Sequence, residues 1–188
     1  LYEGRGVCAG KGQAIVRSES GEEMLTADNI ILSCGSSSAS FPGLTPDGDA
    51  VLDSTGVLNL PEVPESLIIV GAGAIGLELG DFFGMMGSKI TIVEAAPHIA
   101  PTEDADIAKE MDRVQSKAGR TCITGVMAKS LVTKGRQAEL TLGDGRVLTA
   151  SKALVAVGRT PNTAGLDCEK TGCTLKRRGF VDVNDHLE

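Results

Sequence analysis

The apolar positions of the chain fall into short runs that polar and glycine-rich segments separate. Two of these runs, Leu67–Val70 and Ile90–Val93, are continuously apolar and too short for helices, so they predict strands buried on both faces. Between them the apolar residues recur at helical spacing, and Gly87 follows as a C-terminal stop. The predicted buried face of this helix comprises Ile75, Leu79, Phe82, Phe83 and Met86. This part of the chain is therefore expected to form a strand–helix–strand unit.

A second helical pattern follows a polar turn. It runs from about Ala105 to Ala118, with Asp104 as its N-cap and Gly119 as its stop. The predicted buried face comprises Ile107, Met111, Val114 and Ala118. Cys122-Ile123 then forms the next short strand, so the alternation of strands and helices predicts an α/β fold with a parallel sheet.

Beyond this point the period of the pattern changes from helical to alternating. Short alternating runs occupy residues 130–133, 138–142 and 146–149, and tight turns separate them. They predict a three-stranded antiparallel meander. An apolar strand at 153–157 follows and ends at a Gly-Arg-Thr-Pro-Asn segment.

The two ends of the chain give weaker patterns. Residues 7–26 read as a small antiparallel excursion with a turn at Ser20-Gly21, and residues 29–32 read as a short buried strand. The Ser- and Pro-containing segment 36–49 has the composition of a linker and suggests a domain boundary. A last strand is expected at residues 180–183.

The segment between the first predicted strand and its helix has the G-x-G-x-x-G spacing, formed by Gly71, Gly73 and Gly76. In such a turn the first glycine permits a tight bend, the second lets the backbone approach a pyrophosphate, and the third lets helix and strand pack closely. The helix N-terminus presents free N–H groups and a positive dipole end to phosphates. The positions between these glycines that join the candidate site are Ala72, Ala74 and Ile75.

Glu94 ends the second strand, about 20 residues after the glycines, where an acid accepts hydrogen bonds from an adenosine ribose. A carboxylate there also repels a 2′-phosphate, which favours NAD over NADP. Because FAD uses the same glycine spacing, the local motif leaves both dinucleotides possible.

Composition narrows the function classes. The net charge of −7 and the pI near 4.9 argue against a nucleic-acid partner. No apolar run approaches the length of a membrane span. Five cysteines without secretory features favour reduced thiols and a cytoplasmic location, and two isolated histidines argue against a metal site. The chain begins in mid-pattern, and we expect it to be a piece of a longer protein.

Several separated motifs then fall in one order. They are the segment 30–36, the glycine fingerprint 71–78, the acid Glu94 and the segment 157–162. This order resembles the flavoprotein disulfide reductases, which bind two dinucleotides, and most closely the dihydrolipoamide dehydrogenases. The resemblance covers nearly the whole chain.

The resemblance implies a domain organisation. Residues 45–160 would form an NAD-binding domain, a Rossmann-like doubly wound parallel sheet in which a three-stranded β-meander replaces one crossover helix. Residues 1–44 would be part of an FAD-binding domain, and residues 161–188 would return the chain to that domain. The implied cofactors are NAD and, in the full-length protein, FAD.

The resemblance also assigns further site residues. Glu78 would lie beside the nicotinamide, and Ala74 would replace a larger residue that gates it in several members of the family. The residues placed by resemblance at the NAD pocket or near the flavin nucleotide are Val126, Gly158, Cys34, Gly35 and Ser36. The flavin motif departs from the family's Ala-Thr-Gly-Ser, because Ser33 and Cys34 stand at its first two positions.

The implied reaction passes electrons from dihydrolipoamide through a redox disulfide and FAD to NAD. The substrate would be carried on 2-oxo acid dehydrogenase complexes, and the full-length enzyme would be a homodimer. The disulfide and the catalytic His-Glu pair are expected outside this chain, so we assign it no catalytic residue and expect weak NAD(H) binding without turnover. Cys168 and Cys173 repeat the disulfide's spacing, but their flanking residues differ, so we interpret the match as coincidence.

Two alternatives stay open at this point. A sister flavoprotein, such as an NADH oxidase, a transhydrogenase or a mercuric reductase, would share all of these motifs. A non-catalytic NAD-sensing module would need the glycine fingerprint but not the Cys34-Gly35 strand or the Gly158-Arg159 segment.

Overall fold

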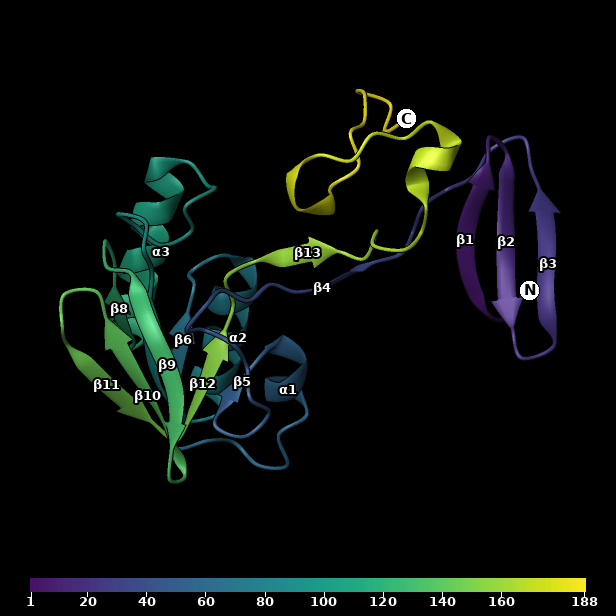
Figure 1. The fold of residues 1–188 in the computed structure, drawn as a ribbon. Coiled ribbons are helices and arrows are strands. Elements are labelled where there is room, and N and C mark those ends of the chain that lie inside the picture. The colour runs from purple at the N-terminus through teal and green to yellow at the C-terminus, as the bar shows by residue number, and fades with distance from the viewer. The chain divides into compact units, whose positions relative to one another are not determined.

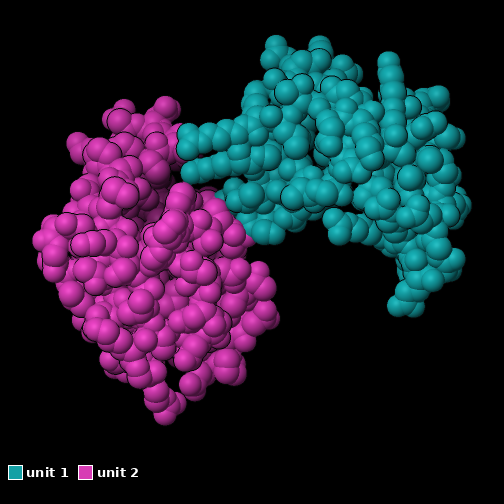
Figure 2. Space-filling view, viewed as in Figure 1, with its two compact units in different colours: residues 1–37, 159–188 teal, residues 38–158 magenta.

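The computed structural model describes residues 1–188, and the chain divides into two units (Figures 1 and 2). Unit 1 comprises residues 1–37 and 159–188, and unit 2 comprises residues 38–158. The second unit is therefore one continuous stretch, whereas the first is built from two distant pieces.

Unit 2 is organised around a parallel sheet of order β5-β12-β6-β7-β8. Its strands are β5 Val51–Leu52, β6 Ser66–Val70, β7 Lys89–Val93, β8 Thr121–Ile123 and β12 Lys152–Val155. Its helices are α1 Ser54–Leu58, α2 Ala74–Met85 and α3 Ala105–Lys117. These bounds confirm the strands and helices expected from the apolar pattern between residues 66 and 123.

The alternating runs form a second, antiparallel sheet of order β11-β10-β9. Its strands are β9 Ala128–Lys134, β10 Gln137–Leu142 and β11 Val147–Ala150. This sheet lies between β8 and β12 in the chain, and it confirms the three strands expected there. The fold is thus mixed α/β, with a parallel sheet and antiparallel sheets.

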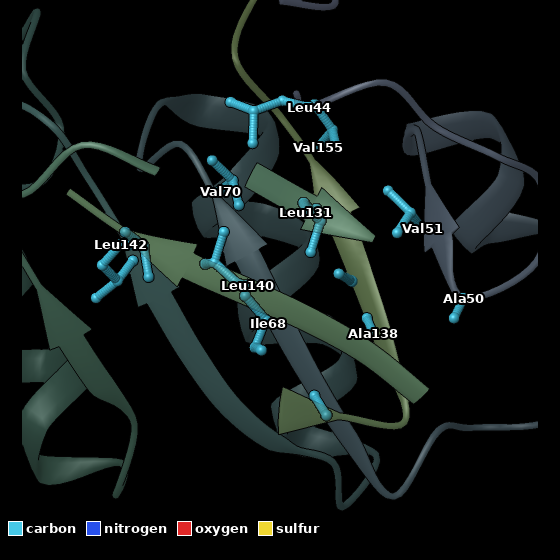
Figure 3. Packing of buried hydrophobic residues seen from close by; sticks show 13 residues of the cluster. Leu44, Ala50, Val51, Ile68, Val70, Leu131, Ala138, Leu140, Leu142 and Val155 are labelled. Atoms are coloured by element: carbon cyan, nitrogen blue, oxygen red, sulfur yellow. The ribbon is translucent and has the colours of Figure 1, made fainter. Parts of the chain in front are cut away.

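Two apolar cores lie on opposite faces of the parallel sheet. Alternate residues of β6 divide between them, because successive side chains of a strand point to opposite faces. Ile68 and Val70 pack with Leu140 of the antiparallel sheet (Figure 3). Leu67 and Ile69 pack in the core that also contains residues of α1 and α2. This arrangement explains why β6 is continuously apolar.

The buried face of α2 differs from the prediction. The buried residues of the helix are Gly76, Leu77, Gly80 and Phe83. By contrast, Phe82 and Met86 are 47% and 56% exposed. Phe83 is buried and Leu79 packs against the core, as expected. Leu77, Gly76 and Gly80 complete the buried face, and the two glycines let the helix approach the sheet. A Cβ on Gly80 would lie 3.0 Å from Cδ1 of Ile69.

The buried face of α3 was also only partly predicted. Met111 packs against the core, but Ile107 and Val114 are 52% and 46% exposed. The buried residues are instead Ala108 and Gln115. The expected ends hold, since the helix begins after Asp104 and Gly119 follows it with φ 75°, although the Asp104 side chain makes no capping hydrogen bond.

Unit 1 contains the antiparallel excursion expected near the start of the chain. Its strands are β1 Arg5–Gly10, β2 Gln13–Ser18 and β3 Gly21–Thr26, in the order β1-β2-β3. Its other regular elements are β13 Arg159–Pro161 and the short 3₁₀ helices η1 Cys168–Thr171 and η2 Arg177–Gly179. The boundary between the units falls within β4 Ser36–Ser38. β4 and β13 pair in a two-stranded sheet.

Two predicted strands do not form. Residues 29–32 have no strand structure, and Ile31 is 89% exposed. The tail segment 180–183 makes only one isolated bridge, between Val181 and Leu175. Residues 29–32 have the composition of a strand but no neighbouring strand to pair with their backbone groups. The tail does pair locally, since Asp182 donates to Thr174 and Lys176 donates to Phe180, but this pairing is too short to count as a strand. No helix combines the length and the apolar character that crossing a bilayer requires.

Candidate functional site

The candidate site lies where the parallel strands of unit 2 end. Because β12, β6, β7 and β8 are neighbours and run parallel, their carboxyl ends meet at one edge of the sheet. Gly158 follows β12, Gly71 follows β6, Glu94 follows β7 and Val126 follows β8. This edge is where ligands bind in open α/β sheets, so residues chosen from distant parts of the sequence converge there.

Gly71 has a backbone conformation that requires glycine. Its φ is +105°, and a Cβ at this position would lie 2.3 Å from the carbonyl oxygen of Ala156. Its N–H donates to the carbonyl oxygen of Val93 at 2.8 Å. The turn therefore leaves β6 in close contact with both neighbouring strands.

Gly76 is required for a different reason. A Cβ on Gly76 would lie 2.0 Å from the carbonyl oxygen of Gly71. Any side chain there would push the first turn of α2 away from the strand end. Gly71 and Gly76 are thus needed by the packing of the protein itself.

The packing of the protein does not require glycine at position 73. Its φ is −78°, which any residue can adopt, and a Cβ there would meet no atom within 4 Å. Gly73 is the N-cap of α2, and no side chain caps the helix. The first N–H groups of a helix have no partner within the helix, so this end of α2 faces open space with the properties of an anion site.

Glu94 points toward the glycine-rich turn. One carboxylate oxygen, Oε2, accepts a hydrogen bond from the N–H of Ala72 at 2.7 Å, and the other, Oε1, accepts one from the N–H of Ala96 at 2.8 Å. The side chain is half-buried. Since an ionised carboxylate has about four acceptor positions, two remain for a ligand.

The loop after β7 completes the turn, which the sequence analysis did not predict. Ala100 is 4% exposed, and its N–H donates to the carbonyl oxygen of Ala72 at 2.9 Å. Its φ of 49° is unusual for a residue other than glycine. Because these contacts are made by backbone groups, residue type carries no signal for them.

Of the other residues expected at the NAD pocket, Val126 and Gly158 lie along the same edge. The N–H of Val126 donates to the carbonyl oxygen of Glu94 at 3.2 Å, and the carbonyl oxygen of Gly158 accepts from Ala39 at 2.9 Å. Glu78 and Ala74 are exposed on α2, and Ile75 between them is half-buried. Val126 is partly buried and packs against the core that contains Leu140.

In unit 1 the segment expected near a flavin is held by the segment after β12. The side chain of Asn162 donates to the carbonyl oxygen of Cys34 at 3.2 Å, and its N–H donates to that of Gly35 at 3.1 Å. Nε of Arg159 donates to the hydroxyl of Ser36 at 2.6 Å. Arg159 thus bonds to the first residue of β4. The part played by Asn162 was not expected.

The cysteines are free thiols. Burial raises the pKa of the Cys8 and Cys168 thiols, which share a side-chain hydrogen bond. The hydroxyl of Thr171 donates to the sulfur of Cys173 at 3.1 Å. No group of three His, Cys, Asp or Glu side chains is placed to hold a metal ion.

Comparisons with known proteins identify the family. The family model described as pyridine nucleotide-disulphide oxidoreductase matches residues 2–188. Dihydrolipoyl dehydrogenase 3 of Pseudomonas putida is 36% identical over 185 residues, which cover 95% of this chain and 40% of that protein. Leghemoglobin reductase of Glycine max is 36% identical over 191 residues, covering 98% of this chain and 36% of that protein. The chain spans about 40% of the length of these relatives.

Solved structures agree with the family match. LpdA of Mycobacterium tuberculosis superposes with a TM-score of 0.85 at 30% identity, covering 96% of this chain and 41% of that one. The HOCl-induced flavoprotein disulfide reductase RclA of Escherichia coli superposes with a TM-score of 0.83 at 30% identity, covering 100% of this chain and 42% of that one. The chain therefore belongs to the pyridine nucleotide-disulphide oxidoreductases, the family of the flavoprotein disulfide reductases.

Proposed function

We propose that this chain is the NAD(H)-binding part of a dihydrolipoyl dehydrogenase. Residues 45–160 would form the NAD domain, a doubly wound Rossmann-type sheet with the antiparallel sheet in place of one crossover helix. Residues 1–44 and 161–188 would belong to an FAD-binding domain. Relatives named dihydrolipoyl dehydrogenase support the activity, and the convergence of the strand ends supports the binding site.

One observation carries the proposal: Gly73 is a glycine that the protein's own packing does not need. The space where its Cβ would lie is open, and the uncapped N-terminus of α2 adjoins it. A dinucleotide's pyrophosphate fits this position, because its negative oxygens accept hydrogen bonds from free helix N–H groups. Gly73, Ala74 and Ile75 would hold the phosphates through their backbone.

Glu94 would select the coenzyme. The acceptor positions that its carboxylate retains would bind the hydroxyls of the adenosine ribose. The same negative charge would repel the 2′-phosphate of NADP, so NAD is the coenzyme proposed.

The remaining residues would place the reactive ends of the cofactors. When bound, NAD accepts a hydride that flavin supplies, and this chemistry belongs to the cofactors. Glu78 would lie beside the nicotinamide, whereas Val126 and Gly158 would line the pocket. Cys34, Gly35 and Ser36 would lie near the flavin nucleotide, where small residues let the backbone come close. The proposed substrate of the longer protein is dihydrolipoamide carried on 2-oxo acid dehydrogenase complexes, and a homodimer is its proposed state.

The similarity to RclA supports a second candidate. RclA and LpdA match this chain at the same 30% identity, so another member of the family, with a different electron donor or acceptor, is a reasonable alternative. Both candidates need the dinucleotide site at the N-terminus of α2. An assay of the longer protein for oxidation of dihydrolipoamide would distinguish them.

A substitution at Gly73 tests the proposed site. We expect Gly73→Ser to leave the free energy of unfolding unchanged or to raise it by a few tenths of a kcal/mol, because serine is a better N-cap than glycine. Its hydroxyl would occupy the phosphate space and cap the free N–H groups. The affinity for NADH, measured by fluorescence titration, should then fall at least tenfold.

Thermal unfolding with and without coenzyme gives the control. For the unsubstituted chain, NADH at about 100 times its Kd should add about 2.7 kcal/mol of stability, and Gly73→Ser should lose most of this gain. Gly6→Ser, at an exposed position of β1 where a Cβ also meets nothing within 4 Å, should keep it. Equal NADH binding by both variants would contradict the proposed site.

A further inference from the structure

We propose that Glu94 also acts as a positioning residue that fixes the shape of the glycine-rich turn, apart from any contact it makes with a ribose. This inference rests on the proposed function, since the turn is taken to hold the pyrophosphate. It concerns the backbone of Ala72, between the first two glycines of the motif.

Ala72 is held on both of its backbone groups by the segment that follows β7. Its N–H donates to Oε2 of Glu94 at 2.7 Å, and its carbonyl oxygen accepts from the N–H of Ala100 at 2.9 Å. Ala72 is fully buried, so water is a poor substitute for either partner. No other residue of the turn is held in this way by a side chain.

The second carboxylate oxygen anchors Glu94 itself. Oε1 accepts from the N–H of Ala96 at 2.8 Å, and the carbonyl oxygen of Ala96 accepts from Gly125 at 2.8 Å. The backbone of Glu94 bonds to the end of β8 through Ile123 and to the loop after β8 through Val126. The position of the Glu94 carboxylate is therefore set by the loops after β7 and β8, independently of its bond to Ala72.

The charge of Glu94 strengthens this contact. Hydrogen bonds from a backbone N–H to an ionised carboxylate are roughly twice as strong as those to a neutral acceptor. Removing the carboxylate would leave the buried N–H of Ala72 without its partner, and the turn would have to move to find another. The N–H groups of Gly73 and Ala74 would move with it.

Coenzyme choice and turn geometry are thus joined in one side chain. Replacing Glu94 by a basic residue, which would suit a 2′-phosphate, also removes the acceptor for Ala72. We therefore expect Glu94→Arg to weaken both NADH and NADPH, with NADH weakened more, rather than to convert one preference into the other.

A comparison of two ligands separates the two roles of Glu94. The probes are NADH and a reduced dinucleotide whose adenosine ribose lacks its 2′- and 3′-hydroxyls, each titrated against the unsubstituted chain and Glu94→Ala. If Glu94 only bound the ribose, the substitution would leave the affinity for the deoxy dinucleotide unchanged, and that result would overturn the inference. We expect this affinity to fall at least threefold and the affinity for NADH to fall further.

An equal loss of affinity for both ligands would support the positioning role and count against the ribose contact. The experiment therefore distinguishes a failure of the positioning role from a failure of the proposed coenzyme selection. A measurement without ligand adds an independent readout. In NMR hydrogen exchange, the N–H groups of Ala72 and Ala96 should exchange at least tenfold faster in Glu94→Ala.

Two further variants guard against loss of the fold. Glu94→Gln keeps one acceptor oxygen and should give exchange rates between those of the unsubstituted chain and Glu94→Ala. Glu103→Gln, in the same loop, changes a carboxylate whose contact is with the Thr102 hydroxyl, and it should leave both amides protected. Unchanged exchange of Ala72 in both Glu94 variants would overturn the inference.

Discussion

Ala100 shows at the scale of one residue how the loop after β7 is constrained. Its φ of 49° lies in the left-handed region, its side chain is buried, and its N–H holds the carbonyl oxygen of Ala72. The left-handed conformation costs an L-residue roughly 1–2 kcal/mol. Glycine would avoid that cost, but it would lose about 0.5–1 kcal/mol of backbone entropy and about 0.8 kcal/mol of methyl burial.

These terms nearly cancel, so we expect Ala100→Gly to change the free energy of unfolding by less than about 0.7 kcal/mol. The matched change Ala108→Gly, at a buried position inside α3, should cost about 1.5–2 kcal/mol, because it loses both helix propensity and a buried methyl. Urea unfolding of both variants provides the comparison. Equal costs would show that the conformation of Ala100 stores no strain.

At the scale of one element, α2 packs through a stripe of glycines. Gly76, Gly80 and Gly84 recur at every fourth position and face the strands or a neighbouring side chain. Next to Gly84 lies Arg120, whose side chain is 7% exposed and whose guanidinium pairs with Asp81 at 2.5 Å. Larger residues would move the helix away from both neighbours.

The glycine stripe predicts different losses of stability at its different positions. In Gly76→Ala the new methyl would meet the carbonyl oxygen of Gly71, which is backbone and cannot move aside, so we expect a loss of about 1–3 kcal/mol or more. In Gly80→Ala it would meet the flexible end of Ile69, and a gain of about 0.8–1 kcal/mol in helix propensity would offset most of the crowding. Chemical denaturation should rank Gly76→Ala well below Gly80→Ala, and the reverse order would contradict the stripe.

At the scale of the whole of unit 2, the segment before β5 ties the two sheets together. The carbonyl oxygen of Gly43 accepts from Leu131 of β9 at 2.7 Å. The carboxylate of Asp47 accepts from the Thr133 hydroxyl of the same strand and from the N–H groups of Asp49 and Val51. One loop thus bonds to the antiparallel sheet and to the start of the parallel sheet.

This tie should depend on pH. Partial desolvation raises the pKa of Asp47, but the hydrogen bonds from Thr133, Asp49 and Val51 outweigh it, so the folded pKa is lowered. Its contribution to stability is therefore complete above the unfolded pKa, near 3.9, and is lost as pH falls through the lower folded value. The stability difference between the unsubstituted chain and Asp47→Asn should be constant above about pH 5. It should shrink below pH 4, and a difference independent of pH would contradict this role.

The sequence predicted more of the fold of unit 2 than of unit 1 for a physical reason. Leu67–Val70 reads as a buried strand because both of its faces meet cores within the same unit. Residues 29–32 have a similar composition but no such neighbours, so composition alone misled. The face of α2 was predicted only in part, because a hydrophobic pattern counts glycine as neutral, whereas packing depends on how closely glycine lets backbones approach.

The candidate site was predictable as far as it depends on side-chain type and spacing. Gly71, Gly76 and Glu94 were found because a glycine conformation and a carboxylate leave a pattern in the sequence. Ala96 and Ala100 were not found because they act through backbone N–H groups, which every residue except proline carries.

The division of unit 1 into two pieces has a consequence for how the chain folds during synthesis. Residues 1–37 leave the ribosome long before residues 159–188, so the first piece must wait for its partner. Bringing distant ends together in an open chain of this length costs on the order of 4 kcal/mol of loop entropy. Once unit 2 has folded, the 2.9 Å hydrogen bond between Ala39 and Gly158 already holds its two ends adjacent. Folding of unit 2 would then bring residues 159–188 next to residues 1–37 and remove most of this entropy cost.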